Sequence, residues 1–269
     1  MRTIFAIFKK ELVSHLTTMW AWVVFAVMSL ISAFFFLGAL HDFHEVHEQA
    51  RSMPRGWADM PHETQVFRNL TDGVVLPLWG AVLVIAMFVA PFLSMRLFAE
   101  ERRNKTFDLL MTAPIRPIEI VLGKFLGAVA VITMTLGLTI VFPVILSLVG
   151  RSESGSSLEW NTVLLGYAAL LLWGATNMAI GMFISSLTES QMVAAFVSFG
   201  IALAWMLLRT IAPNVDEPFR SILAYLSFDE QLKPLMQGIL DLRPFVFFGS
   251  VIALCLMLTH RSLEAQRWT

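Results

Sequence analysis

Six stretches of the chain contain no charged residue and no histidine. They cover residues 16–40, 73–95, 125–150, 160–188, 190–208 and 244–259. A helix that crosses about 30 Å of hydrocarbon needs roughly 20 residues, within a range of about 17–25, and five stretches reach that length. The sixth is shorter, but Arg243 and Arg261 flank it and their long stems can extend to the membrane surface. The pattern predicts an all-α integral membrane protein, a single domain over residues 1–269, with transmembrane helices at about 16–40, 73–95, 120–149, 160–187, 190–208 and 244–260.

Composition supports this prediction. Hydrophobic residues make up 57% of the chain and charged residues 14%, whereas soluble domains carry about 25% charged residues. Little chain is left for a separate soluble catalytic domain. The net charge of −1 provides no basic field for nucleic acid, so nucleic-acid binding is not expected. The single cysteine, Cys255, lies in an apolar stretch and has no partner in the chain for a disulfide.

The first 15 residues have the pattern of an amphipathic helix. Lys9, Lys10 and Glu11 fall away from an apolar face, and we expect this helix, residues 1–15, to lie in the membrane interface. The alternative is an ordinary positively charged flank of the first transmembrane helix. The apolar face consists of Ile4, Phe5, Phe8 and Leu12.

Six membrane crossings place both termini on one side, and basic residues indicate which side. Of the 19 Lys and Arg residues, 11 fall on the side of the termini, six of them in residues 96–124. Because Lys and Arg concentrate in cytoplasmic loops, we expect both termini on the cytoplasmic side of the membrane. The outward segments are then 41–72, 151–159 and 209–243. In the last of these, the helical spacing of Phe219, Ile222, Leu223 and Leu226 predicts amphipathic helices.

The segment after the second predicted transmembrane helix combines a charged stretch with a short apolar face. Glu100 to Arg103 can continue that helix out of the bilayer, Asn104 or Thr106 can cap a new helix, and Pro114 can end it. Such a helix would place Phe107, Leu110 and Met111 on one face, a shape suited to a groove in another protein. From the residues alone, a plain positively charged loop fits equally well.

The run from Glu100 to Ile115 resembles the signature E-E-(basic)-x-x-G-T-x-E-x-L-L-x-T-P-(V/I) of ABC-2 type transporter permeases. Lys105 replaces the usual Gly, which bears on the tightness of the turn, and Asp108 replaces the usual Glu. Three further segments resemble the same family, especially its gliding-motility-associated branch, so that the likeness extends over nearly the whole chain. They are residues 180–191, 237–243 and 263–268.

The resemblance implies that the chain is the membrane-spanning permease subunit of an exporter in the inner membrane of a bacterium. The sequence lacks a G-x-x-x-x-G-K-[ST] phosphate-binding loop, so ATP and Mg would be bound by a soluble P-loop ATPase partner, in two copies. A second permease chain, identical or homologous, and membrane lipid complete the expected partners. The chain itself is expected to be no enzyme and to need no cofactor. The expected ATPase contacts are Glu100, Glu101, Arg102, Arg103, Thr106, Phe107, Asp108, Leu110, Met111, Thr112, Pro114, Ser186, Thr188 and Glu189.

A competing hypothesis places the functional site just beyond the first predicted transmembrane helix. On a helix, His41, His44, His47 and Glu48 lie close enough to share zinc or copper, which would make the chain a metal-binding protein or metalloenzyme. The alternative is a solvated continuation of that helix. A stand-alone channel or secondary carrier is disfavoured, because the six uncharged stretches offer no buried ionisable group for a proton or sodium relay.

Overall fold

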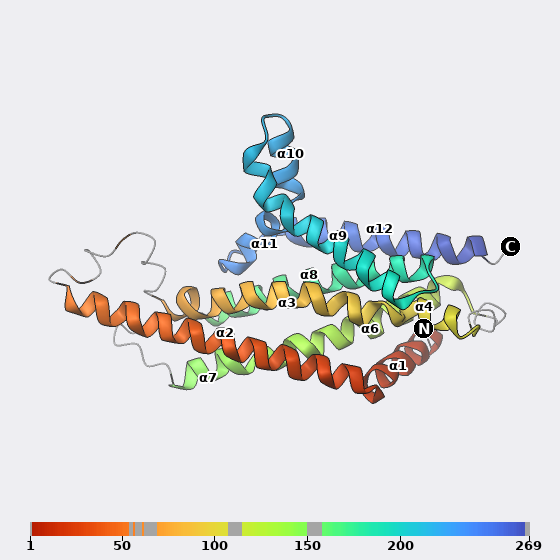
Figure 1. The fold of residues 1–269 in the computed structure, drawn as a ribbon, viewed down its shortest axis with the longest axis horizontal. Helices are drawn as coiled ribbons and strands as arrows, with labels where there is room; N and C mark the ends of the chain where they lie inside the picture. Colours follow the sequence, from red (N-terminus) through yellow and green to blue (C-terminus); the bar gives the residue numbers. More distant parts are fainter. Residues whose placement is uncertain are drawn as a thin grey trace.

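The computed structural model describes residues 2–53, 69–106, 115–149 and 158–266, together with Gly56 and Pro61. Within these ranges the chain is helical and contains no strand (Figure 1). The elements are α1 (Arg2–Thr17), α2 (Met19–Ser52), the π-helical turn η3 (Thr71–Val75), α3 (Leu76–Ser94), α4 (Arg96–Arg103), α6 (Pro117–Thr139), α7 (Val141–Val149), α8 (Trp160–Leu187), α9 (Gln191–Ile211), the 3-10 turn η4 (Ala212–Asn214), α10 (Phe219–Leu226), α11 (Phe228–Met236) and α12 (Arg243–Gln266).

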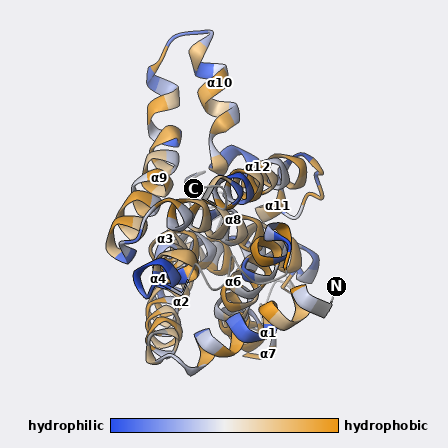
Figure 2. Ribbon diagram, turned by 90° about the vertical axis from the view of Figure 1, so that its right-hand side faces the viewer, coloured by the Kyte–Doolittle hydropathy of each residue, from blue (hydrophilic) through white to orange (hydrophobic). Residues whose placement is uncertain are grey.

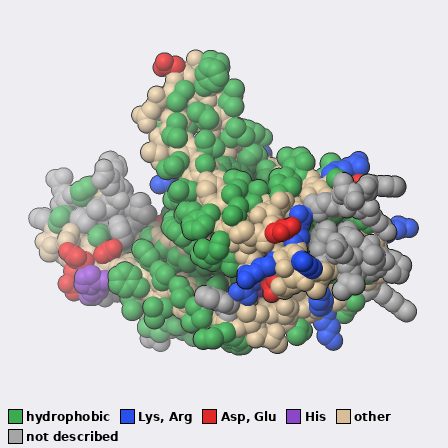
Figure 3. Space-filling view, turned by 45° about the vertical axis from the view of Figure 1, so that its right-hand side comes forward, with side chains coloured by type: hydrophobic (Ala, Val, Ile, Leu, Met, Phe, Trp, Pro, Cys, Tyr) green, Lys and Arg blue, Asp and Glu red, His purple; other side chains and the backbone are tan. Residues whose placement is uncertain are grey.

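Six helical segments of the described chain are long and apolar enough to cross a membrane, which is the number predicted. Figure 3 shows hydrophobic side chains over the middle of the molecule, with charged side chains gathered toward its ends. The chain is therefore a multi-pass membrane protein. The segments are Ala21–Ser52, Thr71–Arg103, Pro117–Val149, Trp160–Leu187, Gln191–Asn214 and Arg243–Ala265.

Helix α8 forms the centre of the bundle, with α3, α6 and α12 around it (Figure 2). In α3 and α8, 67% of the most apolar window is buried, against 22% in α2, α9 and α12. The close fit at the centre depends on Gly166 of α8, because a Cβ atom there would overlap the ring of the fully buried Trp79. The peripheral helices therefore present apolar surface outward, where lipid or another chain can cover it.

Two of the membrane-crossing segments are broken near a proline. Helix α3 contains Pro91 and gives way to α4 at Met95, whose amide still donates to the Pro91 carbonyl at 2.9 Å. Helix α6 ends at Thr139, and α7 begins two residues later with Pro143 in its first turn. A proline has no amide hydrogen and its ring crowds the preceding turn, which accounts for the break before Pro143. The break at Met95 instead follows Pro91 by one helical turn.

Both termini lie at the end of the bundle where α4 emerges, here named the α4 end (Figure 1). The first predicted transmembrane helix, 16–40, has a different boundary in the structure. Helix α1 runs to Thr17, Thr18 adopts an extended conformation, and α2 then continues without a break from Met19 to Ser52. The indole nitrogen of Trp22 donates to the Leu16 carbonyl at 2.9 Å, which satisfies a free carbonyl at the C-terminus of α1.

The predicted helices in the 209–243 segment are α10 and α11. Helix α10 has no buried residue, and with the end of α9 it projects from the bundle (Figure 2). Helix α11 packs on α8, with the ring of Phe228 stacked on that of Trp173 at a centroid distance of 4.2 Å.

Candidate functional site

Four elements meet at the α4 end: α1, α4, the start of α6 and the end of α8. Helix α4 buries Leu97, Phe98 and Ala99 against the bundle. Its last residues, up to Arg103, reach the surface, and they include the charged stretch that the sequence singles out. The structure thus places this stretch next to three other elements.

The start of α4 is fastened by the hydroxyl of Ser185 on α8. That oxygen accepts from the amides of Phe98 at 3.1 Å and Ala99 at 3.0 Å, and it donates to the Met95 carbonyl at 2.9 Å. The first four amides of a helix lack partners within the helix, so Ser185 satisfies two of them from a different element. One hydroxyl therefore uses its whole hydrogen-bonding capacity to join α8 to the break between α3 and α4.

Gly181 lets α8 approach this break closely. A Cβ atom on Gly181 would overlap the side chain of Ser94, the last residue of α3. The absence of a side chain at Gly181 thus allows the contact that brings Ser185, one helical turn further on, within reach of α4.

The end of α4 is held in place by ion pairs. The Nζ atom of Lys124 on α6 lies 2.8 Å from Oε1 of Glu11 on α1 and 2.9 Å from Oε1 of Glu101 on α4. The three side chains are only 3%, 11% and 17% exposed, respectively. Lys124 also lies over the ring of Phe98, 5.2 Å from its centroid. Lys10 of α1 is 3.9 Å from Glu101 but is largely exposed. We name Lys10, Glu11, Glu101 and Lys124 the charged junction.

Helix α1 lies directly on α6 because two glycines of α6 provide room. A Cβ atom on Gly123 would lie 2.8 Å from the Ile7 Cβ atom, and one on Gly127 would lie 2.8 Å from the Glu11 Cβ atom. The prediction that Glu11 turns away from the apolar face of α1 is therefore wrong, since Glu11 points to α6 and is buried by Lys124.

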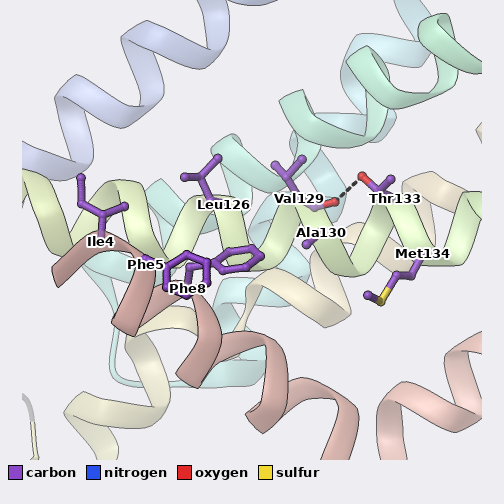
Figure 4. Close-up of a pocket in the computed structure, with 8 residues that line it drawn as sticks. All are labelled: Ile4, Phe5, Phe8, Leu126, Val129, Ala130, Thr133 and Met134. Carbon is purple, nitrogen blue, oxygen red and sulfur yellow. Dashed lines mark hydrogen bonds between the residues drawn. The ribbon is translucent and has the colours of Figure 1, made fainter. Parts of the chain in front are cut away.

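An apolar groove of about 620 Å³ follows the line where α1 meets α6 (Figure 4). Its walls are Ile4, Phe5 and Phe8 of α1, facing Leu126, Val129, Ala130, Thr133 and Met134 of α6. Phe5 is 66% exposed, so this side of α1 presents apolar surface outward.

His15, near the end of α1, is half-buried. Burial lowers the pKa of its imidazole, and the carboxylate of Glu11 opposes that shift only partly. The neutral ring is therefore favoured at this position, since a charged imidazolium would lose its hydration.

A second groove, of about 990 Å³, lies between α2, α3 and the start of α9. Most of its wall is apolar and includes Val27, Phe88 and Phe92, while Arg103 and Glu189 stand at the α4 end. Such a groove can receive an apolar chain or helix that carries a polar group at one end.

The predicted ATPase contacts divide into three groups. Glu100, Glu101 and Arg102 are half-buried at the end of α4, and Arg103 and Thr106 are exposed. In the turn between α8 and α9, Glu189 is exposed and Thr188 half-exposed, and the Glu189 carboxylate acts electrostatically on the Arg102 guanidinium. Ser186 is fully buried and donates to the Phe183 carbonyl. Phe107, Asp108, Leu110, Met111, Thr112 and Pro114 lie outside the described residues.

The backbone conformation of Lys105 shows why the signature described above has glycine at this position. Its φ is 56°, in the left-handed region. Its amide donates to the Arg102 carbonyl at 3.0 Å, and the Thr106 amide donates to the Glu101 carbonyl at 2.9 Å. These two bonds form the Schellman motif, whose left-handed residue is most often glycine. The turn after α4 is therefore tight even though a lysine occupies it.

The histidines past the first transmembrane helix do not gather around a common point. They lie on the continuous helix α2, where His44 is 3.4 Å from Glu48 and both are exposed. His47 stacks on Phe43 and contacts the Phe43 carbonyl through Nδ1 at 3.1 Å. Among the described residues, no three His, Cys, Asp or Glu side chains could hold one metal ion. The metal-binding reading therefore finds no site there.

Sequence reasoning missed Lys124 as part of a site. The uncharged stretches are cut at charged residues, so Lys124 served only as the boundary before residue 125. A usable signal was its position between Gly123 and Gly127 in a helix whose other charged residue is Glu119 in the first turn, because a lysine beside a close-packing face needs a carboxylate partner.

Comparison with protein families matches residues 5–267 to the family described as ABC-2 family transporter protein. Comparison with individually curated proteins gives no match. The family match spans nearly the whole described chain, and six apolar helices fit a membrane permease. The chain therefore belongs to the ABC-2 family of transporter proteins.

Proposed function

We propose that the chain is the membrane-spanning permease subunit of an exporter and that a separate ATPase subunit drives it from the α4 end. Membership in the ABC-2 family implies association with an ATP-binding cassette ATPase. The chain has no phosphate-binding loop of its own, so ATP and Mg belong to that partner. The complete unit contains two ATPase subunits and a second permease chain, identical or homologous, in a bacterial inner membrane with cytoplasmic termini. The resemblance to the gliding-motility-associated branch is part of this proposal.

One observation supports the proposal that the ATPase binds at the α4 end. Helix α4 is bonded to α8 through Ser185 and to α6 and α1 through Lys124. A force applied where the chain leaves α4 therefore acts on three other helices at once. Residues 100–114, together with Thr188 and Glu189, are the surface that we assign to the ATPase.

The experiment is to express the tagged chain with a soluble P-loop ATPase encoded beside it and to purify the complex. Phe107→Asp or Leu110→Asp would place a charge in an apolar contact, and each should release the ATPase. A suitable control is Leu240→Asp, which introduces the same charge at a residue that is 69% exposed and lies just before α12, whose other end leads to the C-terminus at the α4 end. If the folded Phe107→Asp and Leu110→Asp proteins both retain the ATPase, the assignment is wrong.

A further inference from the structure

The charged junction joins three helices through one ammonium group. Lys124 bonds Glu11 of α1 and Glu101 of α4 at nearly equal distances, 2.8 Å and 2.9 Å. Without the lysine, the two carboxylates would be like charges close together in a buried place, and they would repel one another. Lys124 therefore fixes the position of α1 relative to α4, in addition to holding each helix to α6.

The attachment of α1 to α6 resists sliding. Gly123 and Gly127 receive Ile7 and Glu11 at distances that leave no room for another atom, and close-packed surfaces of this kind have few alternative arrangements. A movement of one of these two helices along the other would have to lift Ile7 and Glu11 off the glycines.

Helix α4 contacts the other helices of the junction through one oxygen of the Glu101 carboxylate. Oε1 of Glu101 is 2.9 Å from Lys124 and 3.9 Å from Lys10 of α1. Oε2 of the same residue is buried without a hydrogen-bond partner among the described residues. Both lysines within reach of Glu101 thus belong to the α1 and α6 pair. When the end of α4 moves, charge attraction draws that pair with it.

We propose that Lys124 is a positioning residue that makes α1 move with α4 through Glu11 and Glu101. This inference rests on the proposed function, because it assigns the driving displacement to an ATPase at the α4 end. Since α1 is separated from α2 by Thr18 alone, the displacement reaches the first membrane-crossing helix without passing through α3.

A purely stabilising ion pair would also make the protein less stable when removed, so stability cannot decide the question. The test measures distances between pairs of spin labels in a Cys255→Ser background. A label pair at Ser14 and Asn104 reports α1 against the end of α4, and a pair at Ser14 and Ala265 reports α1 against α12. All three label positions are exposed. The first pair is measured in the chain alone, because Asn104 lies in the surface assigned to the ATPase. The second pair is measured in the complex with the co-expressed ATPase, without nucleotide and with ATP and vanadate.

In the unmodified chain, we expect the Ser14 and Asn104 pair to give one narrow distance distribution. The Ser14 and Ala265 pair should shift with nucleotide by about 1–2 Å or more, as helices do in switching transitions. Lys124→Gln and Glu101→Gln should each broaden the first distribution, and Lys124→Gln, which lies outside the surface assigned to the ATPase, should abolish the shift in the second while the ATPase stays bound. Lys124→Arg keeps the charge and should restore both. Lys9→Gln removes an exposed charge from α1 outside the junction and should behave as the unmodified chain.

The outcomes separate the two proposals. If Lys124→Gln keeps the narrow distribution and the shift, Lys124 only stabilises the fold and the inference is wrong. If the ATPase does not bind the unmodified chain, the proposed function fails, and the width of the Ser14 and Asn104 distribution still tests the junction in the chain alone. If Lys124→Gln does not fold, the width of the Ser14 and Asn104 distribution in Glu101→Gln decides, since its amide can still bond Lys124 while the carboxylate charge is gone, and an unchanged width would overturn the inference.

Discussion

Glu11 on α1 rests against Gly127 on α6 so closely that a Cβ atom on the glycine would lie 2.8 Å from the Glu11 Cβ atom. Contacts between real Cβ atoms and other atoms are essentially never this short. The glycine therefore sets the spacing of the two helices, and this spacing brings the Glu11 carboxylate to Lys124.

Gly127→Ala should consequently destabilise the protein. Inserting a methyl group into a packed contact costs about 1–3 kcal/mol, because α1 must move away from α6. Gly137→Ala is the matched control, since Gly137 lies in the same helix with nothing within 4 Å of its added Cβ atom. That change should stabilise the helix by roughly 0.5–1 kcal/mol. Thermal unfolding in detergent compares the two, and equal midpoints would contradict the close packing of α1 on α6.

Ser185→Ala should weaken the joint between α8 and α4. It leaves the buried amides of Phe98 and Ala99 without their acceptor, at a cost of about 1–3 kcal/mol for an unsatisfied buried group. Ser186→Ala is the control, because Ser186 is equally buried but bonds only the Phe183 carbonyl of its own helix. Its unfolding midpoint should stay close to that of the unmodified protein. Amide hydrogen exchange at Phe98 and Ala99 should accelerate only in Ser185→Ala.

Lys105→Gly should stabilise the turn after α4. A residue with a side chain loses roughly 1–2 kcal/mol in the left-handed region, and glycine avoids that cost. Asn104→Gly is the control for this explanation. The φ of Asn104 is −84°, so glycine there relieves no left-handed conformation. If both changes raise the unfolding midpoint equally, the left-handed conformation of Lys105 is not the cause.

Single cysteines should report the orientation in the membrane. In a Cys255→Ser background, cysteines at Ser52 and Ser221 should react with an impermeant thiol reagent in intact cells. Cysteines at Asn104 and Ala265 should react only after lysis, because Lys and Arg concentrate on the cytoplasmic side. All four positions are exposed. The reverse pattern of labelling would place the α4 end outside and remove the basis for ATPase docking there.

The number of membrane-crossing segments could be predicted because hydrocarbon excludes charge over a fixed thickness, and the uncharged stretches record that exclusion directly. The breaks in the helices could be placed less well. The uncharged stretch 73–95 contains Pro91, but only the structure shows α3 giving way to α4 at Met95. Thr18 offered no comparable signal for the break between α1 and α2.

The charged junction was beyond sequence reasoning for a physical reason. Helical periodicity compares residues within one helix, and on that basis Glu11 belongs with Lys9 and Lys10 on the polar side of α1. Its burial is decided by Lys124, which is 113 residues away in the chain. Ser185 is similar, because it lies in the segment 180–191 that resembles the family, whereas its bonds to Phe98 and Ala99 depend on how α8 crosses α3.

The single extended residue at Thr18 gives the N-terminal part of the molecule, α1 and α2, two arms of unequal length. At 1.5 Å per residue, the 16 residues of α1 span about 24 Å and the 34 residues of α2 about 51 Å. A rotation that moved both arms as one rigid body would therefore displace the far tip of α2 about twice as far as the free tip of α1.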